Sequence, residues 1–373
     1  MKAAVISFTE KGGRWNREIT GRLRAEEADS TGYGFYKYAG EGLTPFTHVK
    51  DLTEGLFASC DLLLFIGATG IALRAVAPFL RGKTKDPAVL VMDECGLHVI
   101  SLLSGHLGGA NEWCRRIALL TGAEPVITTA TDLNGVFAVD VFARENGLAV
   151  RNPEAVREVS GRLLNREAVG FYSDIPWEGE LPPLLVPVTD RETGADEARR
   201  PVCGIVISAE GDRQVFPLSC FLVPRDLTVG IGCRKGISRE EITRCLTRIL
   251  EEKGLWEGRI ARFTSVSLKS AETGIQEEAL ARRVPFLTFT PRELEQVPGS
   301  FHGSSFVEQT VGVDNVCERA AVLGSGSGEL LVEKQAGGGI TIAVARQSAS
   351  AFRVLFRPYA KEDTKNGTAG TVT

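Results

Sequence analysis

Strand and helix patterns alternate along the first 130 residues, and this alternation limits the fold more than any other feature of the chain. Residues 62–66 form a continuous apolar run, which is typical of a strand buried on both faces of a sheet. The run leads into a glycine turn and then into a helical pattern with Ala72 and Val76 on one face. Repeated units of this kind favour a parallel sheet covered by helices. We therefore expect the α/β class, with three-layer α/β/α domains.

The 373 residues exceed what one ordinary core holds, so we expect more than one domain. The alternation weakens over residues 134–224, where a Pro- and charge-rich stretch at 175–201 predicts a loop, and it returns at residue 227. The predicted organisation is an N-terminal α/β domain, a small α+β middle module, a C-terminal α/β domain and a poorly ordered tail, at residues 1–132, 133–224, 225–348 and 349–373.

Composition argues against several classes of function. The formal net charge is −4 and no long Lys/Arg run occurs, which disfavours a nucleic-acid binder. The longest run of low polarity, residues 62–73, is shorter than the about 20 apolar residues that a membrane span needs. Eight cysteines occur without a C-x-x-C pair, and the four histidines lack zinc-ligand spacing. We therefore expect a cytoplasmic protein without a membrane segment or a protein-held metal.

Residues 104–112 read Ser-Gly-His-Leu-Gly-Gly-Ala-Asn-Glu and lie between an apolar run and a helical pattern. A strand, a glycine turn and a helix start bring backbone N–H groups and the positive helix end to one place, which favours an anion. His106 adds a titratable base there. Asp93 and Glu94 follow the preceding strand, where they could orient His106 or act as bases themselves, or only cap a turn or face solvent. We predict His106, Asp93 and Glu94 as the catalytic residues.

Four turns that follow predicted strands carry glycine or hydroxyl groups, at residues 67–70, 104–109, 128–132 and 230–236. Ligands of open parallel sheets bind outside the carboxyl ends of the strands, where such turns gather. We therefore expect one polar, anion-binding cleft, although tight connections also need glycine for backbone reasons alone. The first turn departs from the dinucleotide fingerprint, because Thr69 and Ala72 occupy its second and third glycine positions.

Cations near two of the predicted C-terminal strands suit a ligand that carries carboxylates. Arg234 and Lys235 follow one strand and Lys269 follows the next, and Arg234 and Lys269 would hold such groups across an interdomain cleft. Asn111 could bind substrate or cap its helix, and His302 is predicted to be an exposed loop residue. The predicted substrate-binding residues are Gly67, Thr69, Gly70, Ser104, Gly105, Gly108, Gly109, Asn111, Thr129, Thr131, Asp132, Gly232, Arg234, Lys235, Ser267 and Lys269.

Seven stretches carry a family resemblance, at residues 67–75, 86–89, 102–112, 125–132, 230–236, 265–269 and 338–346. Together they resemble the cobalt-precorrin-5A hydrolase family of anaerobic cobalamin biosynthesis, over about residues 48–348. The resemblance implies that water opens a δ-lactone on a cobalt tetrapyrrole and that a two-carbon fragment leaves as acetaldehyde, giving cobalt-precorrin-5B. It also implies a polycarboxylate substrate that brings its own cobalt, so that no further cofactor is expected. Other corrinoid-pathway enzymes could be partners.

The residues themselves suggest a mechanism for such a reaction. His106, oriented by Asp93 or Glu94, would act as general base on water. The N–H groups of Gly105 and of residues 108–110 would stabilise the oxyanion at the lactone carbonyl. Two other classes of protein stay open at this stage, a non-catalytic corrinoid-binding carrier or assembly protein and a nucleotide-dependent oxidoreductase.

Overall fold

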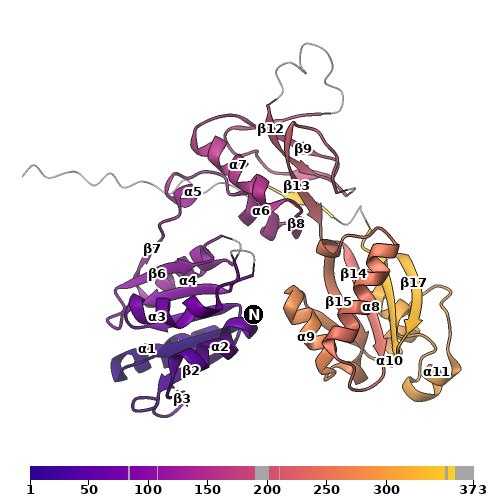
Figure 1. Cartoon of the computed structure of the whole chain (residues 1–373), viewed down its shortest axis with the longest axis horizontal. Coiled ribbons are helices and arrows are strands. Elements are labelled where there is room, and N and C mark those ends of the chain that lie inside the picture. The colour runs from indigo at the N-terminus through magenta and orange to yellow at the C-terminus, as the bar shows by residue number, and fades with distance from the viewer. Residues whose placement is uncertain (83–84, 107, 190–200, 210, 349–351, 358–373) are drawn as a thin grey trace, which may run out of the picture. The chain divides into compact units, whose positions relative to one another are not determined.

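The computed structural model describes the chain except for residues 83–84, 107, 190–200, 210, 349–351 and 358–373. Leu107 of the predicted glycine turn and most of the predicted tail therefore lie outside the described residues. The chain divides into two compact units, Met1–Val141 and Phe142–Thr373 (Figure 1). The first unit holds one large sheet and the second holds two.

The first unit is built on a seven-stranded sheet of order β3-β2-β1-β4-β5-β6-β7. Its strands are β1 (Lys2–Ser7), β2 (Asp29–Phe35), β3 (Thr44–Phe46), β4 (Leu62–Ile66), β5 (Ala88–Met92), β6 (His98–Leu103) and β7 (Glu124–Val126). Its helices are α1 (Glu10–Ala25), α2 (Val49–Ser59), α3 (Thr69–Val76), the short η1 (Ala77–Phe79), α4 (Ala110–Thr121) and α5 (Ala130–Leu133), with α6 (Val139–Glu145) at the boundary to the second unit.

Alternating side chains of the central strands reach two separate cores, one on each face of this sheet. In β4, Leu62, Leu64 and Ile66 pack in a core that includes residues of α1 and α4, whereas Leu63 and Phe65 pack with α2 and α3. Every residue of β4 is buried, as expected for a continuous apolar run with helices on both sides. The predicted three-layer α/β/α arrangement is confirmed in this unit.

The direction of β6 departs from the predicted alternation. Strands β1 to β5 pair in parallel, but β6 runs antiparallel to β5, with Val89 opposite Leu103 and Met92 opposite Val99. Only residues 93–97 connect the two strands, whereas a parallel crossover needs about a dozen residues. The turns after β4 and after β6 therefore lie at opposite edges of the sheet, about 15 Å apart along the strands. The prediction that all the polar turns gather at one cleft is wrong for these two.

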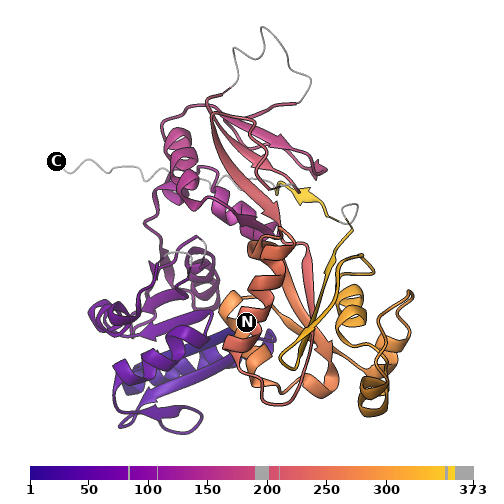
Figure 2. The same cartoon turned by 45° about the vertical axis from the view of Figure 1, so that its right-hand side comes forward.

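The second unit contains a mixed five-stranded sheet that corresponds to the predicted middle α+β module (Figure 2). Its order is β11-β9-β12-β13-β8, in which β8 pairs antiparallel and the other strands are parallel. The elements are β8 (Leu148–Val150), α7 (Pro153–Leu164), β9 (Val169–Ser173), β11 (Leu185–Pro187), β12 (Cys203–Ile207) and β13 (Leu218–Pro224).

The third sheet has the order β16-β15-β14-β18-β17, with β17 and β18 as an antiparallel hairpin beside three parallel strands. Its strands are β14 (Leu227–Cys233), β15 (Ile260–Val266), β16 (Phe286–Phe289), β17 (Glu329–Gly337) and β18 (Ile340–Arg346). Its helices are α8 (Arg239–Glu252), η3 (Glu257–Arg259), η4 (Ser267–Lys269), α9 (Thr273–Arg282), α10 (Pro291–Glu295), α11 (Ser305–Val311) and α12 (Cys317–Gly324).

Helices cover both faces of this third sheet. Residues of α8 and α9 share a core with β14, and α12 packs on the other face with Ala343 and Ala345 of β18. The approach of α12 to β14 requires glycine, because a Cβ at Gly230 would lie 1.9 Å from the carbonyl oxygen of Cys317. The predicted three-layer arrangement is thus confirmed here as well.

Part of the predicted poorly ordered tail is a strand. β19 (Val354–Leu355) pairs in parallel with β10 (Trp177–Glu178). The ring of Phe356 stacks on that of Phe142 at a centroid distance of 4.6 Å. The tail prediction is therefore wrong for these residues, because the burial of one aromatic side chain outweighs the polar composition around it.

Candidate active site

The turn that carries His106 is held in shape by its own backbone. Ser104 has a left-handed φ of 59°, and its carbonyl oxygen accepts a hydrogen bond from the N–H of Ala110 at 3.1 Å. A Cβ at Gly108 would lie 2.3 Å from the Cβ of Ser104, so only glycine fits there. The turn leads directly into α4, which begins at Ala110, and it carries His106.

His106 lies between two carboxylates. Its Nε2 is 2.9 Å from Oδ2 of Asp132, and its Nδ1 is 3.2 Å from Oδ2 of Asp140. The Thr131 hydroxyl is a further hydrogen-bond partner of Nε2, at 3.0 Å. The side chains keep 17% (His106 and Asp132) and 13% (Asp140) of their surface exposed, so the cluster is reachable from solvent. These residues come from the turn after β6 and from α5 and α6.

Asp132 is saturated with donors. Its Oδ2 also accepts a hydrogen bond from Nδ2 of Asn111 at 2.8 Å, and its Oδ1 accepts one from the Arg115 guanidinium at 2.8 Å. The His106 and Arg115 contacts lower the pKa of Asp132 to about 2 despite its burial. Asn111 in turn accepts a hydrogen bond from the Ser101 hydroxyl and donates one to Thr129. Asp132 is therefore a fixed anion that positions its neighbours.

The hydrogen bonds to Asp132 and Asp140 raise the pKa of His106 to about 9. At neutral pH the imidazole is therefore protonated on both nitrogens and carries a positive charge. A doubly protonated ring cannot accept a proton from water. This charge favours a role for His106 as an acid or a hydrogen-bond donor over the predicted general base, and its part in catalysis stays a prediction.

Asp93 and Glu94 do not orient His106. The carboxylate of Asp93 accepts hydrogen bonds from the backbone N–H groups of Cys95, Leu97 and His98 within the β5–β6 turn. Glu94 accepts one from the Thr9 hydroxyl at 2.9 Å. Both acids lie at the sheet edge opposite His106, because β6 reverses direction. The prediction that they orient His106 is therefore wrong, and the alternative of turn capping describes Asp93. A catalytic role of either acid stays a prediction.

Gly67, Thr69 and Gly70 share that opposite edge, at the start of α3. They are therefore separated from His106 by the length of the strands. Two of the predicted oxyanion donors already make hydrogen bonds within the turn. The N–H of Gly109 donates to the carbonyl oxygen of His106 at 2.9 Å, and the N–H of Ala110 donates to that of Ser104. Only part of the predicted anion site is thus open to a ligand.

The structure brings six of the sixteen predicted substrate-binding residues together around His106. They lie in the turns after β6 and β7, in the first turn of α4 and in α5, and β7 pairs in parallel with β6. These residues are Ser104, Gly105, Asn111, Thr129, Thr131 and Asp132. The sequence-based reasoning missed Asp140 and Arg115. Arg115 lies four residues after Asn111 on one helix face, which was a usable signal, but no spacing rule connects Asp140 to His106.

The predicted residues of the second unit gather where β14 and β15 end. The Lys269 ammonium lies 3.0 Å from Oε2 of Glu272, and the Arg234 guanidinium lies 3.7 Å from Oε1 of Glu241. A Cβ at Gly232 would lie 2.5 Å from the hydroxyl of Thr341. Lys235 is exposed and Ser267 begins η4. Their role in binding a substrate stays a prediction.

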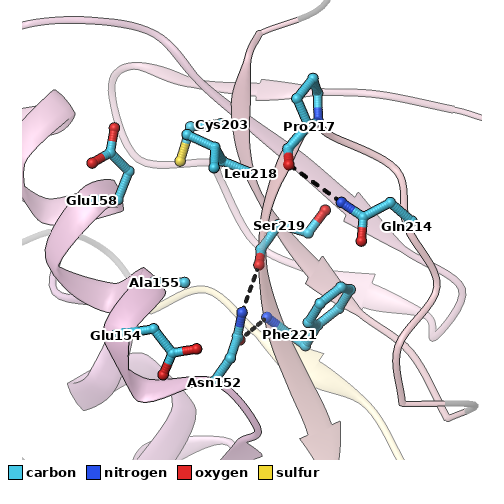
Figure 3. Close-up of a pocket in the computed structure, with 10 residues that line it drawn as sticks. All are labelled: Asn152, Glu154, Ala155, Glu158, Cys203, Gln214, Pro217, Leu218, Ser219 and Phe221. Carbon is cyan, nitrogen blue, oxygen red and sulfur yellow. Dashed lines mark hydrogen bonds between the residues drawn. The ribbon is translucent and has the colours of Figure 1, made fainter.

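A pocket of about 390 Å³ in the middle sheet does not have the chemistry of an anion site (Figure 3). Glu154 and Glu158 of α7 line it. The amide of Asn152 is used by the backbone of β13, donating to Ser219 O and accepting from Phe221 N, both at 2.9 Å. Across the described part of the chain, no group of three or more His, Cys, Asp or Glu residues is placed to hold a metal ion.

No helix of the described residues is long and apolar enough to cross a membrane.

Taken together, layered α/β sheets and a solvent-reachable imidazolium–carboxylate cluster are the features of a multidomain α/β enzyme.

Models of one family match three consecutive parts of the chain. They are described as cobalamin synthesis G N-terminal at residues 51–132, cobalamin biosynthesis central region at 137–224 and cobalamin synthesis G C-terminus at 227–345. The chain belongs to this cobalamin synthesis G family, and the resemblance seen in the sequence is confirmed.

Two named hydrolases agree with the family models. The cobalt-precorrin-5A hydrolase of Salmonella typhimurium is 38% identical over 319 residues, covering 83% of this chain and 88% of the relative. That of Priestia megaterium is 32% identical over 361 residues, covering 92% and 94%. A solved cobalamin biosynthesis protein G homolog from Sulfolobus solfataricus is 24% identical, with a TM-score of 0.41 and coverage of 93% and 97%.

Proposed function

We propose that this protein is a cobalt-precorrin-5A hydrolase, which opens the δ-lactone of its substrate with water and releases acetaldehyde to leave cobalt-precorrin-5B. The observation that carries the proposal is the match to two hydrolases of that name over most of both chains. The His106 cluster supports it, since it holds a proton donor and a carboxylate acceptor side by side in a partly exposed site.

Asp140 is the general base in this proposal. Asp132 already accepts hydrogen bonds from His106, Asn111 and Arg115, and its pKa of about 2 makes it a weak base. Asp140 contacts His106 through Oδ2, and its Oδ1 accepts a hydrogen bond from the N–H of Val141 at 3.0 Å. Asp140 thus accepts fewer of the hydrogen bonds described above than Asp132 does. It takes a proton from the attacking water as the bond between the water oxygen and the lactone carbonyl carbon forms.

His106 acts as the acid. The Nδ1–H of the imidazolium makes the longer of the two carboxylate contacts, 3.2 Å to Asp140 against 2.9 Å to Asp132 for Nε2. It is the donor that turns to the lactone carbonyl oxygen and stabilises the negative charge that develops there. When the intermediate collapses, the ring C–O bond breaks and the leaving oxygen takes a proton from His106. The freed alcohol then returns its proton to the now neutral His106 while the adjacent C–C bond breaks. Acetaldehyde departs, and the electron pair of that bond stays on the macrocycle.

The substrate carries its cobalt and several carboxylates in this proposal, and no other cofactor takes part. Arg234, Lys235 and Lys269 are the cations that suit those carboxylates. We place the reaction in the cytoplasm, which is consistent with eight cysteines that form no disulfide within the described residues. Other corrinoid-pathway enzymes would supply the lactone and take the product.

The test is the release of acetaldehyde from cobalt-precorrin-5A, which is measured by coupling it to an alcohol dehydrogenase. The purified protein should release one equivalent, and His106→Ala should slow release by about 100-fold or more. His98→Ala, an exposed histidine of the same sheet, is the matched control and should retain full activity. Binding of the lactone by the unaltered protein without any acetaldehyde would refute the hydrolase and indicate a carrier.

A further inference from the structure

His302 lies in the loop between α10 and α11, far along the chain from the residues used above. Its Nδ1 is 3.0 Å from Oε1 of Glu318, a carboxylate whose side chain is fully buried in the first turn of α12. The imidazole itself is 61% exposed. The prediction of an exposed loop residue is correct for the ring, but the hydrogen bond to a buried carboxylate also fixes how the ring is oriented.

Glu318 is an anion built into the fold. It accepts hydrogen bonds from the backbone N–H groups of His302 at 2.8 Å and Lys334 at 2.7 Å, and from the side chain of Asn315. These hydrogen bonds hold its pKa below the ordinary value in spite of burial. Since the carboxylate can only accept, Nδ1 of His302 must carry the hydrogen, and the lone pair of neutral His302 is on Nε2.

The backbone of His302 is fixed as firmly as its ring. Its N–H donates to Glu318, and its carbonyl oxygen accepts hydrogen bonds from Nδ2 of Asn315 at 3.0 Å and from Nζ of Lys334 at 3.3 Å. The Nε2 atom lies 3.9 Å from Oε2 of the exposed Glu333, beyond hydrogen-bond distance. In its neutral form, the ring therefore presents one oriented nitrogen lone pair to solvent.

The other three histidines differ in this respect. Both nitrogens of His106 lie within 3.2 Å of carboxylates. Those of His98 face Asp93 and Glu124 at 3.5 and 3.9 Å, on an exposed strand end. His48 is exposed at the start of α2 and makes no side-chain capping bond there. Among the four histidines, all of which the structure describes, His302 alone combines a buried carboxylate partner on one nitrogen with an exposed second nitrogen.

A carboxylate on the far nitrogen is the usual support for a metal-binding histidine, because it fixes the ring and raises its basicity. One imidazole is too little to hold a free metal ion. A cobalt in a tetrapyrrole already has its equatorial nitrogens and lacks only axial ligands. We propose that Nε2 of His302 is an axial ligand to the cobalt of the macrocyclic substrate, an inference that rests on the proposed function. The Nε2 lone pair forms the Co–N bond, and the oxidation state of the cobalt does not change.

Electron paramagnetic resonance of bound cob(II)inamide tests this assignment. The unpaired electron of low-spin Co(II) points along the axial direction, so one axial nitrogen splits each cobalt line into a triplet. The full-length protein should give triplets, and labelling with ¹⁵N-histidine should turn them into doublets. His302→Ala and His302→Gln should abolish the splitting and weaken cobinamide binding by about tenfold or more.

Single alanine variants of His48, His98 and His106 should keep the triplets and serve as controls. Triplets that persist in both His302 variants, or their absence in the unaltered protein at saturating cobinamide, would overturn the assignment. Cobinamide has no lactone, so this result does not depend on turnover. A protein that releases acetaldehyde but shows no nitrogen splitting would leave the hydrolase standing and remove the axial ligand alone.

Discussion

At His106, two carboxylates and the Arg115 guanidinium form a nearly neutral cluster with the imidazolium. The pairing explains how a charged ring is held in a site that is mostly shielded from water, since each buried charge has an opposite partner. It also fixes the chemistry, because a ring with both nitrogens protonated donates and does not accept.

The pH dependence of turnover follows from the pKa of about 9. Imidazolium is the active form, so kcat/KM should stay level through neutral pH and fall as the pH rises past about 9. A neutral His106 base would instead lose activity as the pH falls below its ordinary 6.5. Initial rates of acetaldehyde release across this pH range distinguish a charged His106 acid from a neutral His106 base. A fall in kcat/KM as the pH drops below about 6.5 would contradict the charged form.

The two carboxylates should respond differently to substitution. Asp140→Asn removes the base and should lower kcat by about 100-fold. Asp132→Asn leaves the base in place but removes one of the anions that raise the pKa of His106, so the alkaline limb should move toward neutral pH. The kcat values of both variants should be measured at the same pH. A larger loss in Asp132→Asn than in Asp140→Asn would mean that Asp132, and not Asp140, is the general base.

Stability should depend on pH through the same residue. The pKa of His106 rises from 6.5 to about 9 on folding, so its contribution is complete below pH 6.5 and disappears as the pH rises through about 9. The gap corresponds to at most about 3 kcal/mol. Thermal unfolding at several pH values should show a difference between the unaltered protein and His106→Ala that shrinks over this window. A constant difference would mean that the ring is neutral in the folded state.

At the scale of elements, the turn between β6 and α4 sets the position of His106. Gly108→Ala should force the turn open, because the new Cβ would meet both the Cβ and the carbonyl oxygen of Ser104, at 2.3 and 2.9 Å. We expect reduced kcat together with lower stability. Gly21→Ala in α1 is the matched control, since nothing lies within 4 Å of its Cβ position and alanine should stabilise the helix by up to about 1 kcal/mol. Unchanged turnover in Gly108→Ala would show that the turn is more adaptable than its geometry implies.

The strand β19 makes its own prediction. Phe356 packs against Phe142, Phe171 and Trp177 at centroid distances of 4.6, 5.2 and 5.7 Å. Phe356→Ala should lower the free energy of unfolding of the second unit by about 3 kcal/mol in urea titrations. Leu355→Ala, which removes a half-exposed side chain of the same strand, should change it little. Equal effects would mean that the strand pairing, not the ring, holds this segment.

Over the whole molecule, most of the architecture could be predicted. Continuous apolar runs such as residues 62–66 indicate strands covered on both faces, and the structure has helices on both sides of the first and third sheets. The reversal at residues 93–97 could also have been inferred, since so short a connection only suits a hairpin. That single reversal moved Asp93, Glu94 and the turn at Gly67 to the far edge from His106.

The site was predicted in part for the same reason. Ser104, Asn111 and Asp132 stand in turns whose composition marks them as polar and tightly bent, and they do meet around His106. Asp140 follows an apolar stretch with no local signal. Its contact with His106 depends on where α6 returns after β7, which no pattern within the chain encodes.

The sequence by itself determined the elements, the layered α/β class, the glycine turn and the family, because these depend on local periodicity, backbone geometry and motif spacing. The tertiary structure decided which acids reach His106 and that the ring is charged. Strand direction sets which loops share an edge, and a pKa depends on charges brought together in space from distant positions in the chain.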